Sequence, residues 1–287
     1  MKCTNFIFIL LALCIALSGC SLETGVYAPE ISFDEIPEFS GEPYVILENN
    51  MPDFDDEALT ADSFEKYSLL DSLGRCGAAI ACIGRNIMPT EERESIGQVK
   101  PSGWRISKYD FVDGKYLYNR CHLIGYQLTG ENANEQNLIT GTRYFNAEGM
   151  LPFENMVAEY VEETGNHVLY RVTPIFEGSN LVANGVKMEA KSIEDGGEGI
   201  CFNVYVYNVQ PGVEIDYATG ENRLERITNH SKDEETGIYI LNKSSKKFHK
   251  ISCKNAQDIK EKNKGNFSGS RSELIRNGYL PCGACNP

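Results

Sequence analysis

One amphipathic segment followed by strand-like segments constrains the fold more than any other feature of the chain. Apolar side chains recur there at i, i+3, i+4, i+7 and i+8, the spacing of one helix face: Phe153, Met156, Val157, Tyr160 and Val161. Pro152 suits the first turn of this helix, and Gly165 suits its end. Strand-like composition follows over the ranges 167–176, 181–193, 200–209 and 213–217. Mixed strands with few helices predict an α+β domain.

The first 20 residues are typical of a targeting segment and not of folded structure. Lys2 precedes an apolar run over residues 6–17, which is short for a bilayer span. The run ends in Leu-Ser-Gly-Cys20, which resembles a bacterial lipobox. The resemblance implies a lipid anchor on Cys20, export, and attachment to the outer face of the cell membrane or later release. An ordinary signal peptide or a signal anchor is the alternative.

The formal net charge of −14 is unevenly distributed over the 287 residues. Residues 21–66 hold 13 Asp or Glu against one Lys, so we expect a mostly extended acidic linker there. The β-like run over residues 44–47 is the part of it that is able to pack on the core. Residues 238–287 hold three acids against ten Lys or Arg. The pI of about 4.8 argues against a nucleic-acid partner, but the basic C-terminal segment is able to hold a polyanion.

Side chains suited to phosphodiester chemistry gather in the middle of the chain. His122 follows a strand-like segment, and an imidazole is suited to remove a proton from water. The amide oxygens of Asn137 and Asn146 are hard neutral ligands for a hydrated Mg²⁺. Arg120 and Arg143 offer guanidinium groups for a phosphate. A base, a hard metal site and guanidinium groups together favour phosphodiester hydrolysis.

The sequence Asn-Arg-Cys-His over residues 119–122, followed by Leu-Ile-Gly-Tyr-Gln, resembles the Asp-Arg-Gly-His signature of the DNA/RNA non-specific endonucleases. The closer likeness is to the streptococcal DNA-entry nuclease branch. Further matches in the family's order occur at 70–75, 88–91, 100–104, 208–212 and 216–217. The resemblance covers about residues 68–226. It implies a ββα-metal (His-Me finger) core with a mixed or antiparallel sheet, in a domain spanning residues 67–230.

The resemblance also implies a role for each matching residue. His122 matches the general base that activates water, and Arg120 matches an arginine near the substrate phosphate. Asn146 matches the protein ligand of a catalytic Mg²⁺ or Mn²⁺, and Asn137 matches an asparagine that supports the site. Glu154 matches a helix carboxylate that accepts hydrogen bonds from metal-bound water. The implied protein is a surface-anchored, metal-dependent endonuclease that cuts DNA, and RNA as well, with no obligate protein partner.

Two departures from the signature keep alternatives open. Asn119 replaces its aspartate, and Cys121 replaces its glycine. The lost charge at residue 119 leaves open a catalytically inactive, nucleic-acid-binding surface lipoprotein. A structural cell-wall protein is a third class. A cysteine hydrolase using Cys121 and His122 is disfavoured, because neighbouring side chains on a strand point to opposite faces.

Residues 237–287 contain a second cluster of potential ligands. His249 and Cys253 form a pair spaced by three residues, and Cys282 and Cys285 form a pair spaced by two. This spacing is close to that of structural zinc sites, and one Zn²⁺ would fold a segment that lacks a core. The segment resembles the small metal-binding domain of the Ada DNA-repair protein, with His249 in place of its first cysteine. A disulfide between Cys282 and Cys285 is the alternative.

Overall fold

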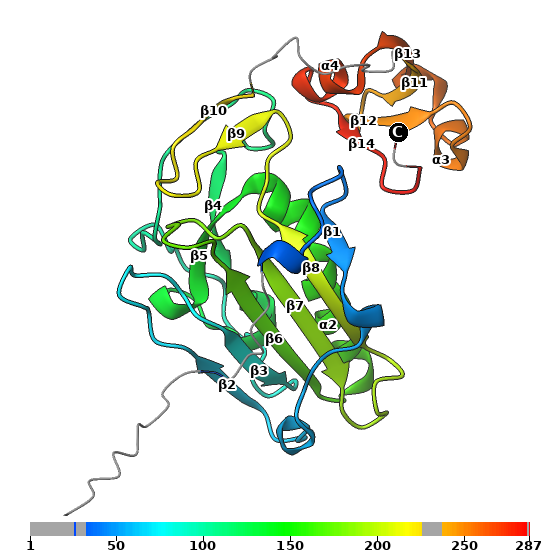
Figure 1. Ribbon diagram of the computed structural model, residues 1–287. Coiled ribbons are helices and arrows are strands. Elements are labelled where there is room, and N and C mark those ends of the chain that lie inside the picture. Colours follow the sequence, from blue (N-terminus) through cyan, green and yellow to red (C-terminus); the bar gives the residue numbers. More distant parts are fainter. Residues whose placement is uncertain (1–25, 27–32, 226–236, 286) are drawn as a thin grey trace, which may run out of the picture.

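The main element of the protein is a six-stranded antiparallel sheet, seen in a computed structural model that describes residues 26, 33–225, 237–285 and 287 (Figure 1). The strand order is β1-β8-β7-β6-β3-β2, and each neighbouring pair is antiparallel. The strands are β1 (Tyr44–Ile46), β2 (Phe64–Tyr67), β3 (Ala79–Ile83), β6 (Val168–Ile175), β7 (Gly185–Ser192) and β8 (Cys201–Tyr207). Three of the strands predicted from composition therefore form the centre of this sheet, which confirms the α+β class.

The predicted helix is α2 (Leu151–Thr164), and it packs on one face of the sheet (Figure 1). Pro152 lies in its first turn, and Gly165 ends it in the left-handed conformation at φ 76°. Phe153 contacts Phe202 of β8, with ring centroids 4.9 Å apart. Met156 is 46% exposed, so its assignment to the buried face of the helix is wrong.

Residues 33–59, most of the segment predicted to be an acidic linker, add the edge strand β1 to the sheet and pack on its opposite face. Val45 and Leu47 pack there against Tyr205 and Tyr207 of β8, and a second apolar cluster lies under β2 and β3. The linker prediction for 21–66 is therefore wrong over residues 33–66. The overall acidic composition of this segment hides the few apolar side chains that decide its packing. Because these side chains cover the second face of the sheet, residues on both faces of β8 are buried.

Buried charges attach this acidic segment to the sheet. Arg171 Nη2 lies 2.8 Å from Glu189 Oε2, and Lys187 Nζ lies 3.2 Å from Glu189 Oε1. These three residues are 3% exposed or less. The backbone N–H of Asp53 donates to Glu189 at 3.0 Å, and its carbonyl accepts from Arg171 at 2.5 Å. One buried carboxylate thus holds two cations of the sheet and the covering segment together.

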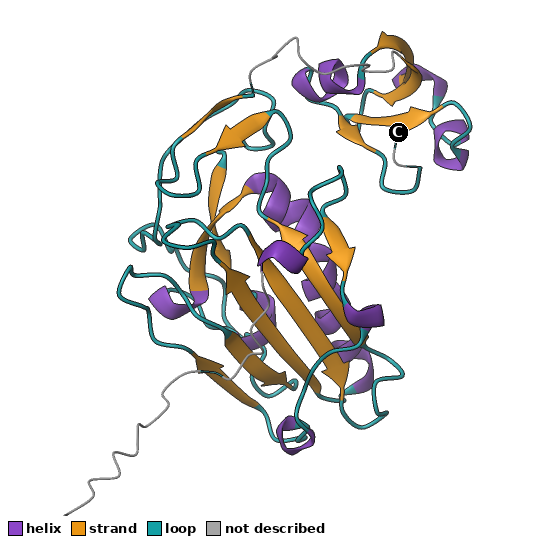
Figure 2. Cartoon of the chain, viewed as in Figure 1, coloured by secondary structure: helices purple, strands orange, loops and turns teal. Residues whose placement is uncertain are grey.

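The remaining elements form three smaller sheets with short helices, as Figure 2 shows by colour. In the central domain they are β4 (Tyr118–His122), α1 (Tyr126–Thr129), β5 (Leu138–Thr142), the π-helix η5 (Phe145–Met150), β9 (Val213–Ile215) and β10 (Asn222–Leu224). Four short 3₁₀ turns lie in residues 33–137 (Phe33–Glu35, Glu48–Asn50, Asp56–Ala58 and Glu135–Asn137), and a fifth, Glu261–Asn263, lies in the C-terminal module. The C-terminal module contains β11 (Gly237–Asn242), β12 (Lys247–Lys250), α3 (Lys254–Gln257), β13 (Lys264–Gly269), α4 (Arg271–Arg276) and β14 (Leu280–Pro281). β12 and β14 are parallel, so this sheet is mixed.

The predicted signal segment 1–20, with Cys20, lies outside the described residues. Among the residues that the structure describes, none of the helices has the length and apolar character needed to cross a bilayer. The boundary that we predicted at residue 230 also falls outside them.

Replacing the buried carboxylate tests the attachment of residues 33–59. We expect Glu189→Gln to lower the free energy of unfolding by about 3 kcal/mol or more, because Arg171 and Lys187 lose their shared anion in the interior. Urea denaturation measures this loss. The control is Glu198→Gln at an exposed position, where we expect a change within about 0.5 kcal/mol. Equal stability of the two variants would contradict the structural role of Glu189.

Candidate active site and metal centre

His122 is the last residue of β4 and is 6% exposed. Its Nε2 lies 2.7 Å from the carbonyl oxygen of Asn132, and its Nδ1 lies 3.3 Å from Nη2 of Arg93. Because a carbonyl oxygen only accepts, this geometry assigns the proton to Nε2 and the lone pair to Nδ1. Burial lowers the pKa of His122 to about 4, with Arg93 acting in the same direction and the Asn132 carbonyl opposing. The imidazole is therefore neutral at pH 7 and able to accept a proton at Nδ1.

Asn137 fixes the loop that follows His122. Its side-chain oxygen accepts from the N–H of Ile124 at 2.9 Å, and its side-chain nitrogen donates to the carbonyl of Ile124 at 3.0 Å. Its own carbonyl accepts from the N–H of Leu123 at 2.9 Å. Asn137 is fully buried, so this paired contact holds the chain directly after His122 in one position.

Arg93 is a site residue that the sequence analysis missed. It is exposed and comes from the long loop between β3 and β4, which shows no hydrophobic period and few chemical signals. Its guanidinium donates toward His122 Nδ1, and its charge opposes the rise of the pKa of Glu154. A single cation thus acts on the base and on the helix carboxylate, which indicates that all three side chains face one region.

Glu154 lies in the first turn of α2, with its carboxyl group against Gly125. A Cβ at position 125 would lie only 2.9–3.1 Å from the carboxyl atoms, so the glycine leaves the space that this side chain needs. Burial raises the pKa of Glu154 to about 7, while Arg93 lowers it. Within the described residues, the carboxylate has neither a hydrogen bond nor an ion pair within 4 Å.

Asn146 lies on η5, directly before α2, and is partly buried. π-helical turns of this kind are frequent at functional sites. No hydrogen-bond partner is found for its side chain in the described part of the chain. Asn146 and Glu154 therefore offer an amide oxygen and a carboxylate without protein partners. Such hard oxygen donors fit Mg²⁺ or Mn²⁺.

The two predicted arginines, Arg120 and Arg143, both bind groups other than His122. Arg120 lies on the same face of β4 as His122 by strand alternation. Its Nη2 donates to the carbonyl of Gly97 at 2.8 Å, its Nε donates to the carbonyl of Val99, and its guanidinium lies 4.0 Å from the Trp104 ring centroid. Arg120 thus braces the loop before β4.

Arg143 is paired with Asp113, with Nη2 and Oδ2 2.7 Å apart. Its Nη1 also lies 3.5 Å from Oδ1 of Asn119. The residue that replaces the signature aspartate therefore faces Arg143, on the side of β4 opposite to His122. The structure does not bring Arg143 into contact with the base.

Cys121 is a packed thiol. It is fully buried, and a Cβ on Gly141 would lie 2.5 Å from its sulfur. Burial raises the pKa of Cys121, which makes it a poor nucleophile. The prediction that Cys121 and His122 do not form a nucleophile–base pair agrees with this environment. Cys76 and Cys82 are also buried, whereas Cys201 is only partly buried.

The C-terminal module brings its four predicted ligands together. One ligand atom from each of His249, Cys253, Cys282 and Cys285 lies within 4.8 Å of the others. The three cysteines are free, so the alternative of a disulfide between Cys282 and Cys285 is not seen. The N–H of Lys250 points to the sulfur of Cys285 at 3.4 Å, a contact that stabilises a thiolate. Three sulfur atoms and one imidazole match a closed tetrahedral zinc site.

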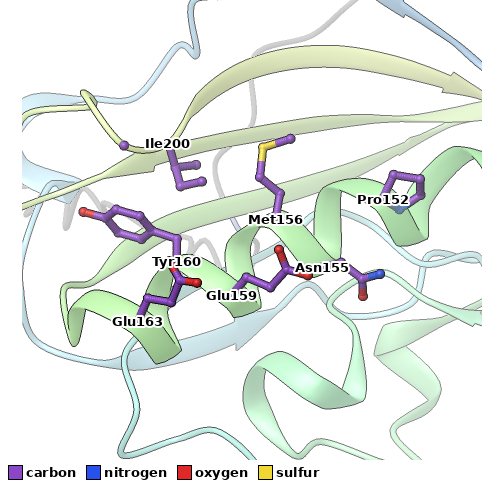
Figure 3. A pocket seen from close by; sticks show the side chains of 8 residues that line it. Pro152, Asn155, Met156, Glu159, Tyr160, Glu163 and Ile200 are labelled. Carbon is purple, nitrogen blue, oxygen red and sulfur yellow. The ribbon is translucent and has the colours of Figure 1, made fainter.

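A groove of about 450 Å³ lies between α2 and the chain that enters β8 (Figure 3). It is lined by Pro152, Asn155, Met156, Glu159, Tyr160, Glu163, Gly199 and Ile200. None of these is a predicted site residue.

Comparisons with known proteins agree with this geometry. The family model of the DNA/RNA non-specific endonuclease matches residues 56–194. NucA from Streptococcus agalactiae, in structures with a magnesium ion bound and with no metal bound, is 28% identical. These structures cover 63% and 67% of this chain and 86% and 92% of their own, with TM-scores of 0.56 and 0.57. The Sda1 nuclease with bound zinc ion, at 24% identity, 63% and 96% coverage and a TM-score of 0.52, supports the fold alone.

The depressed pKa of His122 predicts how stability depends on pH. Below about pH 6.5 the unfolded chain takes up a proton at this histidine, whereas the folded chain does so only near pH 4. The free energy of unfolding therefore decreases as the pH falls from about 6.5 to about 4, because only the unfolded chain binds this proton there. Relative to His122→Gln, we expect the wild-type chain to lose about 2 kcal/mol between pH 7.5 and pH 5. Urea titrations of both proteins measure the difference, and a constant difference would contradict the low pKa.

Proposed function

Because the central domain of this chain belongs to the DNA/RNA non-specific endonuclease family, we propose that the protein hydrolyses phosphodiester bonds of DNA and RNA with a divalent cation, Mg²⁺ or Mn²⁺. Nuclease relatives and the family match support hydrolysis of a nucleic acid. The observation that carries the detailed proposal is the buried, neutral His122 with its Nδ1 directed toward Arg93.

In this proposal His122 acts as the general base. In the proposal Arg93 turns from Nδ1 to the phosphate, which frees the lone pair of Nδ1. Nδ1 then takes a proton from a water molecule while the water oxygen forms a bond to phosphorus, and the bond from phosphorus to the leaving sugar oxygen breaks. The Asn132 carbonyl, which holds the Nε2 proton, stabilises the imidazolium that forms. Asn137 keeps the loop after His122 in place during this step.

Arg93 is suited to hold the reacting phosphate. Its guanidinium is exposed and already lies beside the base, so a phosphate bound there would be within reach of the activated water. Arg120 contributes by bracing the 97–104 loop next to the substrate, and Arg143 binds the substrate farther from the base.

Asn146 is the proposed protein ligand of the catalytic cation, and Glu154 accepts hydrogen bonds from water molecules around it. The bound cation supplies Lewis-acid stabilisation of the charge that develops on the phosphate oxygens. The magnesium ion bound to NucA from Streptococcus agalactiae supports this proposal.

We also propose that the protein recognises the sugar–phosphate backbone of the nucleic acid and that it is exported. Contacts to phosphates carry little sequence information, which suits cleavage without sequence specificity. The lipobox-like sequence ending at Cys20 supports export and a lipid anchor at the outer face of the cell membrane. A protein placed there would meet nucleic acid outside the cell.

The C-terminal module is proposed to bind one structural Zn²⁺ through His249, Cys253, Cys282 and Cys285. The four atoms leave no open position for a substrate in a tetrahedral site, so this ion would stabilise the fold and take no part in hydrolysis.

A plasmid-nicking assay tests the catalytic proposal. We expect His122→Ala to reduce nicking by about 10²–10⁴-fold, because the reaction loses its general base. We expect Asn146→Ala to lose most of the nicking activity, and added Mg²⁺ should not restore it, because the cation loses its protein ligand. Nicking should stop when Mg²⁺ is omitted and return when it is added.

The matched control is His167→Ala. His167 is paired with Glu194, with Nδ1 and Oε1 2.7 Å apart, and it contacts none of the proposed site residues among the described part of the chain. Its loss should leave nicking within about twofold. Salt-sensitive binding without nicking by the wild-type chain would instead identify an inactive nucleic-acid-binding protein.

Metal analysis tests the C-terminal site. We expect the purified chain to carry about one zinc per molecule by elemental analysis, and Cys282→Ser to lose it. Removing zinc with a chelator should expose the lysine-rich module to trypsin, because metal binding supplies its folding energy. A chain with no zinc and a disulfide between Cys282 and Cys285 by mass spectrometry would overturn the assignment.

A further inference from the structure

An exposed aromatic and basic surface lies on residues 105–116, just before β4. Ile106 is 75% exposed and Tyr116 is 49% exposed. Lys108 Nζ lies 4.4 Å from the ring centroid of Tyr116, and an antiparallel bridge between these two residues keeps them opposite each other. An exposed ring beside cations is a feature with which proteins stack and hold single-stranded nucleic acid, and Tyr116 is the exposed ring here.

The charge of this surface is positive although the whole chain is acidic. Asp110 is paired with Lys115 at 3.1 Å, and Asp113 is paired with Arg143. Arg105 and Lys108 form no ion pair within 4 Å in the part of the chain that the structure describes. Their charges are therefore available to phosphates.

The surface continues onto the C-terminal module. A Cβ on Gly278 would lie 3.2 Å from Cβ of Phe111, so the module meets the loop here. Gly278 has a φ of 76° and therefore favours glycine. Tyr279 is the next residue, and Lys246 Nζ lies 4.7 Å from its ring centroid. A second lysine–tyrosine pair thus begins next to the glycine that meets Phe111.

Residues 116–122 connect this surface to the proposed active site. Leu117 donates its N–H to the Ser107 carbonyl, and its carbonyl accepts from the N–H of Arg143. The chain bends at Leu117, and β4 begins at the next residue. Six residues span at most about 20 Å, so Tyr116 lies within this distance of His122.

We propose that Tyr116, Lys108 and Arg105, continued by Lys246 of the C-terminal module, bind single-stranded nucleic acid and lead it to His122. A base stacks on Tyr116, and the three cations bind backbone phosphates. Bases inside a duplex are already stacked on each other, so this surface favours single strands and locally unpaired ends. The inference rests on the proposed nuclease function and names the form of its substrate.

Binding is measured with the full zinc-loaded chain carrying His122→Ala, which prevents cleavage. The probe is a fluorescein-labelled 20-nucleotide DNA strand, followed by anisotropy, with a duplex of the same sequence for comparison. We expect Tyr116→Ala to weaken single-strand binding about tenfold, and Tyr116→Phe to keep it within twofold because the ring remains. Duplex binding should change less than twofold in both variants.

Salt dependence separates the charge contribution. We expect Lys108→Gln to reduce the slope of log K against log salt by about 0.7. Lys66→Gln is the matched control, because Lys66 Nζ also lies over an aromatic ring, 5.2 Å from the Phe64 centroid, but on β2. Its slope should equal that of the parent.

Unchanged single-strand binding by Tyr116→Ala, or equal effects of Lys108→Gln and Lys66→Gln, would overturn the proposal while leaving the nuclease function intact. Failure of the chain with His122 to nick plasmid DNA would overturn the nuclease function, and the binding measurements would still decide the role of Tyr116.

Discussion

The hydrogen bond between His122 Nε2 and the carbonyl of Asn132 is the interaction on which the proposed chemistry depends. It assigns the proton to one ring nitrogen and leaves the lone pair on the other, toward Arg93. Burial keeps the ring neutral, so no other side chain has to deprotonate it first. Asn137 holds the chain directly after His122, and the ring therefore has a fixed direction.

This local arrangement depends on a sheet with both faces covered. On one face, α2 carries Glu154 toward Gly125, in the turn that follows His122. On the other face, the acidic segment 33–59 is attached by the buried Arg171–Glu189 pair. A sheet buried on both faces is a rigid support, and a rigid support is what positions groups from β4, η5 and α2 relative to each other.

The sequence predicted those parts of the fold that depend on local periodicity. The helix 151–164 followed from its apolar spacing, its proline and its terminal glycine, and the central strands followed from their composition. The error over residues 33–66 has a different origin. Acidic composition indicates a solvated chain, and only the β-like run 44–47 pointed to packing on the core. The partners of that segment lie on strands more than 100 residues away, and the local sequence does not identify them.

The candidate site was predicted to a similar extent. His122 and the four C-terminal ligands follow from motifs, and the four ligands do converge in space. Arg93 was not predicted, because an arginine in an irregular loop carries no positional signal until the loop folds back onto β4. The placement of Asn119 next to Arg143 was equally hidden, since it depends on the pairing of β4 with β5.

Chemical rescue tests the central claim most directly. In His122→Gly the side chain is replaced by a space of imidazole size in a buried position, so added imidazole has a place to bind. If His122 is the general base, imidazole should restore Mg²⁺-dependent nicking in proportion to the concentration of its neutral form, and it should not stimulate the wild-type chain. Nicking by His122→Gly at the wild-type rate without imidazole, or no response to imidazole in a variant that is folded by circular dichroism, would contradict the account.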